Sequence, residues 1–311
     1  MDKLKNLTPA LIALIMLGFF IWALMPKDDF SDKISEKLNN EKQKADVVFK
    51  AATLAEVSDG IKYWELVAKT AVINKSLGVA NLSVVDGLFF DKGHPTIKFL
   101  APSAVWRINK NEIVLADPIG YDIKYEKTIK DELAKIKDPA RLSSFFHLPE
   151  KIGKKYEGYW FSAKNLDWKL STKKLLCSGA ITLTKGDIMI NAEELEADVG
   201  LEKVSLTGNP SGEIFTDSKK INITADKFLV DSYQDIVTAD KNVIVTRNGS
   251  KLNADKAVYD QKKGAIELSG GVSLTRDNNK VYGEKMLLLL SGNKIIIQGR
   301  TKAQITGAEI R

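Results

Sequence analysis

From residue 60 onwards the chain alternates apolar and polar side chains in short runs, which is the period of β-strands. Turn-forming dipeptides such as Asn248-Gly249 separate the runs, which are rich in β-branched residues. Ile266 and Leu268 share one face of such a run, and Glu267 faces the other way. The pattern predicts an all-β fold with a continuous apolar face. That face is assigned to Ile181, Leu183, Val204, Leu206, Val243, Val245, Ile266, Leu268, Val272, Leu274, Ile295 and Ile297.

A short motif recurs in this region at nearly constant spacing. An Ala or Gly, usually followed by an acidic residue, returns after 29, 33, 29 and 29 residues, and a second position, usually Gly, follows each one sixteen residues later. A fixed period of this size indicates stacked units that bury their faces on one another. The small residue suits a tight bend, and the glycine permits a bulge or a positive φ. The two sets are Ala163, Ala192, Ala225, Ala254 and Gly283, and Gly179, Gly208, Lys241, Gly270 and Gly299.

Two fainter copies extend the repeat towards the amino terminus, at Ala68 and Ala101, which are 33 residues apart. The next interval, from Ala101 to Ala163, is 62 residues, close to one short and one long unit together. It contains an interruption at residues 126–158, which lack alternation and favour a short helical insertion. Residues 124–155 carry nine Lys/Arg and five Asp/Glu, so most of the formal charge of +6 lies there.

The amino-terminal segment has a different pattern. Asn6 to Pro26 is an uncharged apolar run of 21 residues, long enough to cross a bilayer as a helix. Lys3 and Lys5 precede it, which favours a cytoplasmic amino terminus with the bulk of the chain in the periplasm. A cleaved signal peptide is the alternative, although no clear Ala-x-Ala site follows. The next residues, up to 59, are polar with apolar positions at three- and four-residue spacings, which predicts a helical spacer.

Composition and motifs bear on the chemistry. The chain is 44% apolar and 28% charged, which suits a folded protein, and its one cysteine, Cys177, excludes an internal disulfide. The two histidines, His94 and His147, have no ligand-like spacing, and phosphate-loop, nucleotide and serine-hydrolase motifs are absent. The sequence therefore predicts no enzyme, no cofactor and no metal site. A modest, local excess of basic residues also disfavours nucleic-acid binding.

The acid-base pairs beside the repeated small residues, such as Asp255-Lys256, could be interpreted as a metal or sugar site. A solvated corner with offsetting charges is the favoured interpretation.

The anchor, the opening Trp64-Glu65-Leu66 run and the tandem Ala-acid-Lys units resemble the LptC and LptA/OstA families of periplasmic lipopolysaccharide-transport proteins. The closest stretch is Asn253 to Asp260 followed by Leu268 to Leu274, and the resemblance covers about residues 60–125 and 159–311. The resemblance implies an elongated, twisted, open β-jellyroll whose apolar groove holds acyl chains. The chain departs from it by being longer than a typical LptC-type protein and by its basic insertion. The expected segments are 1–26, anchor; 27–59, spacer; 60–125, LptC-like; 126–158, insertion; and 159–311, LptA/OstA-like repeats.

The resemblance also implies the function and partners. The chain would carry lipopolysaccharide or a related glycolipid from an inner-membrane ABC transporter complex of the LptB/LptF/LptG type to an LptA-like bridge or an LptD-like partner. Because family members join through strand edges, the expected partner edges are Tyr63, Trp64 and Leu66 at one end and Ala303 and Ile305 at the other. Two alternatives stay open: an envelope scaffolding protein without a lipid, and a polysaccharide-modifying β-helix enzyme. An open apolar groove or a closed core would separate the first two.

Overall fold

A computed structural model describes residues 47–305, apart from 59, 92, 128–130, 132–157, 199–200, 217–219, 278 and 292–293. The chain divides into two units, Met1–Ala45 and Asp46–Arg311, and every described residue belongs to the second. The predicted membrane span, most of the spacer and most of the basic insertion lie outside the described residues. Within the described part, no helix has the length and hydrophobicity needed to span a membrane.

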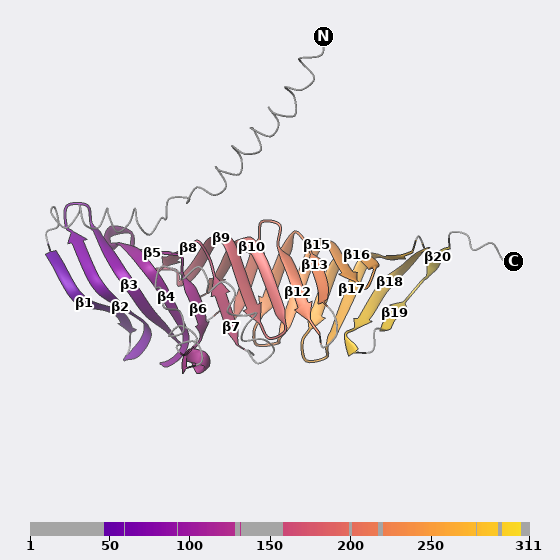
Figure 1. The fold of residues 1–311 in the computed structure, drawn as a ribbon, viewed down its shortest axis with the longest axis horizontal. Coiled ribbons are helices and arrows are strands. Elements are labelled where there is room, and N and C mark those ends of the chain that lie inside the picture. Colours follow the sequence, from indigo (N-terminus) through magenta and orange to yellow (C-terminus); the bar gives the residue numbers. More distant parts are fainter. Residues whose placement is uncertain are drawn as a thin grey trace, which may run out of the picture. The chain divides into compact units, whose positions relative to one another are not determined.

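The second unit is built from antiparallel strands that follow one another in sequence order (Figure 1). Two short 3₁₀ turns, η1 (Ile108–Lys110) and η2 (Ile123–Tyr125), interrupt them. The strands are β1 (Val47–Ser58), β2 (Ile61–Asn74), β3 (Val79–Asp91), β4 (His94–Arg107), β5 (Glu112–Ala116), β6 (Ile119–Asp122), β7 (Tyr159–Ser162), β8 (Asn165–Lys169), β9 (Lys174–Lys185), β10 (Ile188–Asp198), β11 (Lys203–Thr207), β12 (Ser211–Phe215), β13 (Lys220–Thr224), β14 (Lys227–Asp231), β15 (Ile236–Arg247), β16 (Ser250–Asp260), β17 (Ala265–Arg276), β18 (Asn279–Leu289), β19 (Lys294–Gln298) and β20 (Lys302–Gln304).

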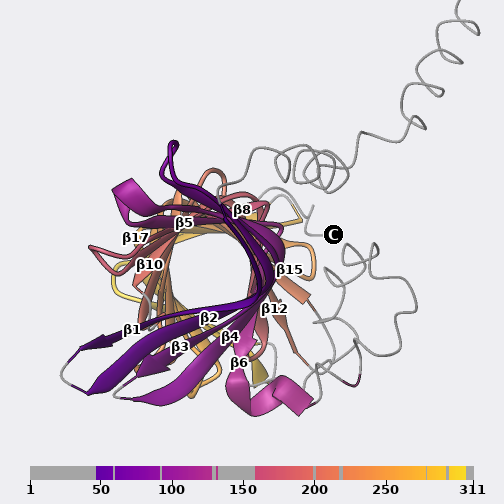
Figure 2. The ribbon, with the colours of Figure 1, turned by 90° about the vertical axis from the view of Figure 1, so that its left-hand side faces the viewer.

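The strands form one hydrogen-bonded sheet folded into two layers. The long strands run through both layers: the first half of β4 pairs with β6 and its second half with β5, and β10 likewise pairs with β12 and then β11. We call the layer with β5, β8, β11, β14 and β19 layer A, and the layer with β6, β7, β12, β13 and β20 layer B. In Figure 2, β5 and β8 lie on the side opposite β6. The core side chains of both layers lie between them.

The repeated positions mark the corner where the sheet passes from one layer to the other. Ala192 lies between the halves of β10, and the register shifts there. Equivalent shifts interrupt β15, β16 and β17. The second position of each unit has a positive φ, and the series includes residues sixteen positions after Ala68 and Ala101. These are Val84 (48°), Asp117 (46°), Gly179 (74°), Gly208 (76°), Lys241 (62°), Gly270 (76°) and Gly299 (82°).

The corner also explains why glycine prevails at the second position. A Cβ added to Gly270 would lie 2.7 Å from the Cβ of Asp255, and one added to Gly208 would lie 2.6 Å from the Cβ of Glu193. Asp255 and Glu193, each of which follows a first-position alanine, therefore pack against the bare backbone of these two glycines. A side chain there would need both a left-handed backbone and a displaced neighbour.

The structure corrects two expectations for the first part of the chain. Residues 47–58, expected in a helical spacer, form strand β1, which pairs along its length with β2. Val47, Ala52, Leu54 and Glu56 are its less exposed positions, and the last three show the two-residue period of a strand paired with β2. The interval from Ala101 to Ala163 contains one unit, not two, because β6, which ends at Asp122, pairs directly with β7, which begins at Tyr159.

Candidate functional site

The space between the layers holds one continuous apolar cluster contributed by strands from β2 to β18. Inward side chains of layers A and B meet there, and alternate residues on the same strands face outward. At its carboxy-terminal end the cluster is less enclosed, since Leu274, Ile295 and Ile297 are only half-buried while packing against it.

The residues predicted for the apolar face lie in or against this cluster. Ile181, Leu183, Val204, Leu206, Val243, Val245, Ile266, Leu268 and Val272 are each no more than 1% exposed, and Leu274, Ile295 and Ile297 line the less enclosed end. In the most buried part of the interior, these residues pack against other side chains of the protein, as in a closed core. Whether lipid contacts them stays a prediction.

Sequence reasoning missed the aromatic part of the same cluster. The Trp168 ring lies 4.8 Å from Trp64, 4.6 Å from Phe89 and 5.9 Å from Phe99 between ring centroids, each in an edge-on arrangement. Gly87 leaves room for Phe99, because a Cβ there would lie 1.8 Å from the ring. The alternation of Trp64 with Leu66, and of Phe89 with Gly87, could have signalled this face.

A second aromatic pair lies on the outward face of layer B. Tyr121 and Trp160 stack with centroids 6.4 Å apart and planes at 15°, and both are fully buried. They lie outside the main cluster. No period in the sequence predicts this patch, because a single pair on the outward face of two four-residue strands does not repeat.

The predicted amino-terminal partner edge is wrong. Tyr63, Trp64 and Leu66 belong to β2, which pairs with β1 on one side and β3 on the other. Trp64 and Leu66 are buried in the cluster, and the edge position passes to β1, which pairs with β2 alone among the described residues. At the other end Ala303 lies in β20, which pairs with β18, and Ile305 follows it at 76% exposure.

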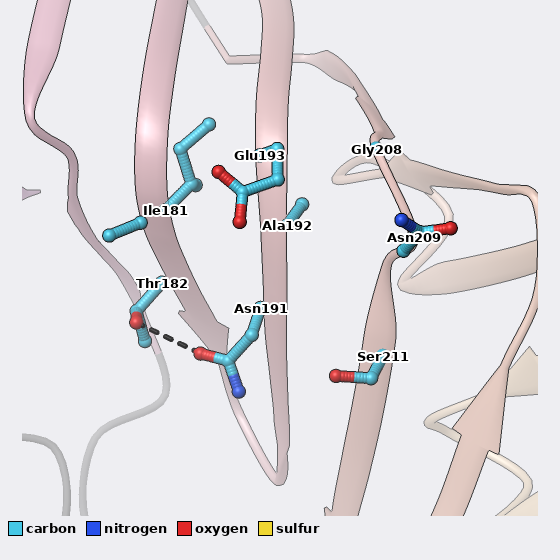
Figure 3. A pocket seen from close by; sticks show the side chains of 9 residues that line it. Ile181, Thr182, Asn191, Ala192, Glu193, Gly208, Asn209 and Ser211 are labelled. Atoms are coloured by element: carbon cyan, nitrogen blue, oxygen red, sulfur yellow. Dashed lines mark hydrogen bonds between the residues drawn. The ribbon is translucent and has the colours of Figure 1, made fainter. Parts of the chain in front are cut away.

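A shallow hollow of about 270 Å³ lies at the corner where β9, β10 and β12 meet (Figure 3). Thr182, Asn191 and Ser211 form one outward row there, and the Thr182 hydroxyl donates to Asn191 Oδ1 at 2.9 Å. Glu193 is its one titratable group. A lone carboxylate among hydroxyl and amide groups offers no acid-base pair for catalysis.

The margin opposite the corner, which we call the seam, is where the far ends of the two layers meet. Lys185 of layer B donates from Nζ to Asp235 Oδ1 at 2.7 Å and to the Ser232 carbonyl at 3.1 Å, both in the turn after β14. Lys262 reaches the other oxygen of Asp235 at 3.1 Å. The hydrogen bond from Lys185 is the main cause that holds the pKa of Asp235 below its ordinary value.

A second set of contacts lies beside the first. The Gln261 side chain of layer A donates to the Lys185 carbonyl at 2.9 Å and to Asp187 Oδ1 at 3.1 Å. The Tyr259 hydroxyl donates to the other oxygen of Asp187. Burial, and then this hydrogen bond, raise the pKa of Tyr259 well above its ordinary value, so it stays a donor at neutral pH.

The seam is bridged at two more places. Towards the carboxy terminus, Arg247 of layer B donates to the Leu289 and Leu290 carbonyls of layer A at 2.9 and 3.0 Å. Towards the amino terminus, the Lys173 ammonium of layer A lies 3.8 Å from the centroid of the Tyr63 ring in layer B. Polar side chains therefore join the layers on this side.

The chemistry of the site is that of an apolar container. Among the described residues no group of three or more His, Cys, Asp or Glu side chains could hold a metal ion. Cys177 is buried, and burial raises the pKa of its thiol to about 12, so it is not a nucleophile at neutral pH.

The fold and the site define a two-layered antiparallel β-jellyroll with a long apolar interior. Residues 161–294, less than half of the chain, match the model of the family described as "LptA/(LptD N-terminal domain) LPS transport protein". Among solved structures, the chain is similar to LptH from Pseudomonas aeruginosa, the LptA-homologous periplasmic component of the lipopolysaccharide transport device. The identity is 11% and the TM-score 0.25, over 50% of this chain and 99% of that one. No curated protein matches.

Proposed function

We propose that this chain is a carrier in lipopolysaccharide transport, which holds the acyl chains of lipopolysaccharide or a related glycolipid between its two β-layers. The observation that carries the proposal is the continuous apolar cluster running from β2 to β18 inside a repeat that matches the LptA/LptD amino-terminal family over residues 161–294.

Apolar burial supplies the affinity. Each Å² of acyl chain removed from water contributes roughly 25 cal/mol, so a bare aliphatic surface suffices without specific contacts. The half-buried Leu274, Ile295 and Ile297 are where such surface is already accessible. The sugar head group would remain in water, outside the layers.

The proposal extends to place and partners. The apolar run Asn6 to Pro26 would anchor the chain in the inner membrane with the β-unit in the periplasm. Lipid would arrive from an ABC transporter complex and leave to an LptA-like bridge or LptD-like partner. Among the described residues, the strand edges left open for these junctions are those of β1 at one end and of β19 and β20 at the other.

Site-specific photo-crosslinking tests the lipid contact. A photoreactive residue at Leu274 or Ile297 should capture lipopolysaccharide, whereas one at Glu267 or Gln298, which are exposed on the same strands, should not. Equal capture at both sets of positions would show that acyl chains do not enter between the layers.

A specific observation also favours a second function. Most of the cluster is no more than 2% exposed, as in a packed protein core, which suits an envelope scaffolding protein without a ligand. Lipopolysaccharide capture at Ile297 alone, with none at Leu268, would mean that only the end of the core accepts lipid. No capture at any inward position would favour the scaffold.

A further inference from the structure

We propose that the seam is a latch: the polar side chains that join layers A and B there break and re-form, so that the layers part sideways and an acyl chain passes between them. This inference rests on the proposed function and concerns the control of the same interior.

The two margins of the sandwich are built differently. At the corner the backbone itself passes from layer to layer in β10, β15, β16, β17 and β18. At the seam, the described strands pair only with strands of their own layer, and side-chain contacts connect layer A to layer B. Opening at the seam therefore requires no strand pairing to be broken, whereas opening at the corner would disrupt every unit.

The largest group of these seam contacts meets at one turn of layer B. At the turn between β9 and β10, Lys185 donates a hydrogen bond to Asp235, which lies in one hairpin of layer A. Asp187 of the same turn accepts hydrogen bonds from Tyr259 and Gln261, which lie in the next hairpin of layer A. One turn of layer B thus holds two turns of layer A. Loss of the Lys185 ammonium would remove its two contacts with the opposite layer and leave Asp235 paired with Lys262 of its own layer.

The Arg247 bridge closes the next stretch of the seam. Arg247 is 7% exposed and holds two backbone carbonyls of the opposite layer, at the end of β18 and just beyond it. Beyond this bridge lie Ile295 and Ile297, the half-buried part of the interior. The transition from buried to half-buried core therefore coincides with the last of these bridges along the described seam.

The native cysteine reports whether the seam opens without any lipid. Cys177 faces the interior and is 4% exposed, so a maleimide reaches it only when the layers part. Lys185→Ala and Asp235→Asn should speed its alkylation by about fivefold, and the exchanged pair Lys185→Asp with Asp235→Lys should return it to the wild-type rate.

The matched control is Lys220→Ala, which removes a 2.7 Å pair with Glu213 inside layer B. Its alkylation rate should equal that of the wild type. Unchanged rates in both seam variants, or equal acceleration in the control, would overturn the latch. Circular dichroism melting of each variant identifies any acceleration that comes from global unfolding.

A reversible clamp then tests passage of lipid. Lys185→Cys with Asp235→Cys, joined by a reductant-cleavable bis-maleimide, holds the seam shut in the full chain. Transfer of pyrene-labelled lipopolysaccharide from micelles should fall about tenfold and recover on cleavage. Undiminished transfer through the clamped seam would overturn the latch. If the clamp slows Cys177 alkylation but no form of the protein takes up lipid, the seam opens as proposed, whereas passage of an acyl chain and the proposed carrier function both fail.

Discussion

The interior differs between its two ends. From β2 to β8 it is aromatic and interlocked, with Trp168 edge-on to Trp64, Phe89 and Phe99. From β9 to β19 it is mainly aliphatic, with Val, Ile and Leu from both layers. Edge-on rings interlock in a fixed mutual orientation, whereas aliphatic side chains present a plain hydrocarbon surface of the kind that acyl chains also have. The first part is therefore expected to hold the two layers together, and the proposed acyl chains are expected in the second part.

Trp168→Ala should have the largest effect. It removes the ring that contacts three other aromatic residues and leaves a cavity, which should cost about 3–5 kcal/mol of unfolding free energy. Denaturant unfolding of the β-unit measures it. Ile297→Ala, at the half-buried end, is the matched truncation and should cost clearly less. Equal losses would remove the distinction between the two ends.

The corner gives the next effect. Gly270→Ala places a Cβ against Asp255 and forces an L side chain into positive φ, which should cost about 1–3 kcal/mol. Lys241→Gly, at the equivalent position with φ 62°, relieves the same conformational strain and should not destabilise the fold. Thermal melting of both variants checks the pair, and a destabilised Lys241→Gly would mean that the corner is held by side chains instead.

The fold was more predictable than its boundaries. The repeat from Ala163 to Gly283 marked the corner positions of these units, because the corner depends on local backbone and side-chain sterics that recur in each unit. The inward residues followed from alternation for the same reason. Strand β1 was missed because its exposed positions include Val48 and Phe49, so its hydrophobic pattern does not alternate cleanly.

The seam was beyond sequence reasoning. Lys185 and Asp235 are 50 residues apart and lie in different units, so no repeat or motif connects them. Only the twist and packing of the two layers bring these turns together. The same holds for Arg247 and the carbonyl groups that it reaches.

Acid should weaken the seam. The pKa of Asp235 is lower in the fold than in the unfolded chain, so its contribution to stability is complete above about pH 4 and is lost as the pH falls through its folded value. Because Asp235 is one-third exposed, Asp235→Asn should cost only about 1 kcal/mol at pH 7. The difference from wild type in urea unfolding should shrink towards zero below pH 3. A difference that persists there would assign the effect to packing.

The smallest effect is expected at an exposed pair on the corner. Lys285→Ala removes a 3.0 Å contact with Glu267, in which both side chains are about half exposed, and should change stability by less than about 0.5 kcal/mol. A larger loss of thermal stability would show that the acid-base pairs beside the repeated small residues stabilise the fold, contrary to their interpretation as a solvated corner.

Hydrogen exchange with and without lipopolysaccharide micelles tests most directly the claim that the aliphatic end accommodates acyl chains. Lipid should change amide exchange in β15 to β19 and at the seam turns around Lys185 and Asp235, and it should leave the aromatic part from β2 to β8 unchanged. Changes confined to β2 to β8, or no change anywhere in the β-unit, would contradict it.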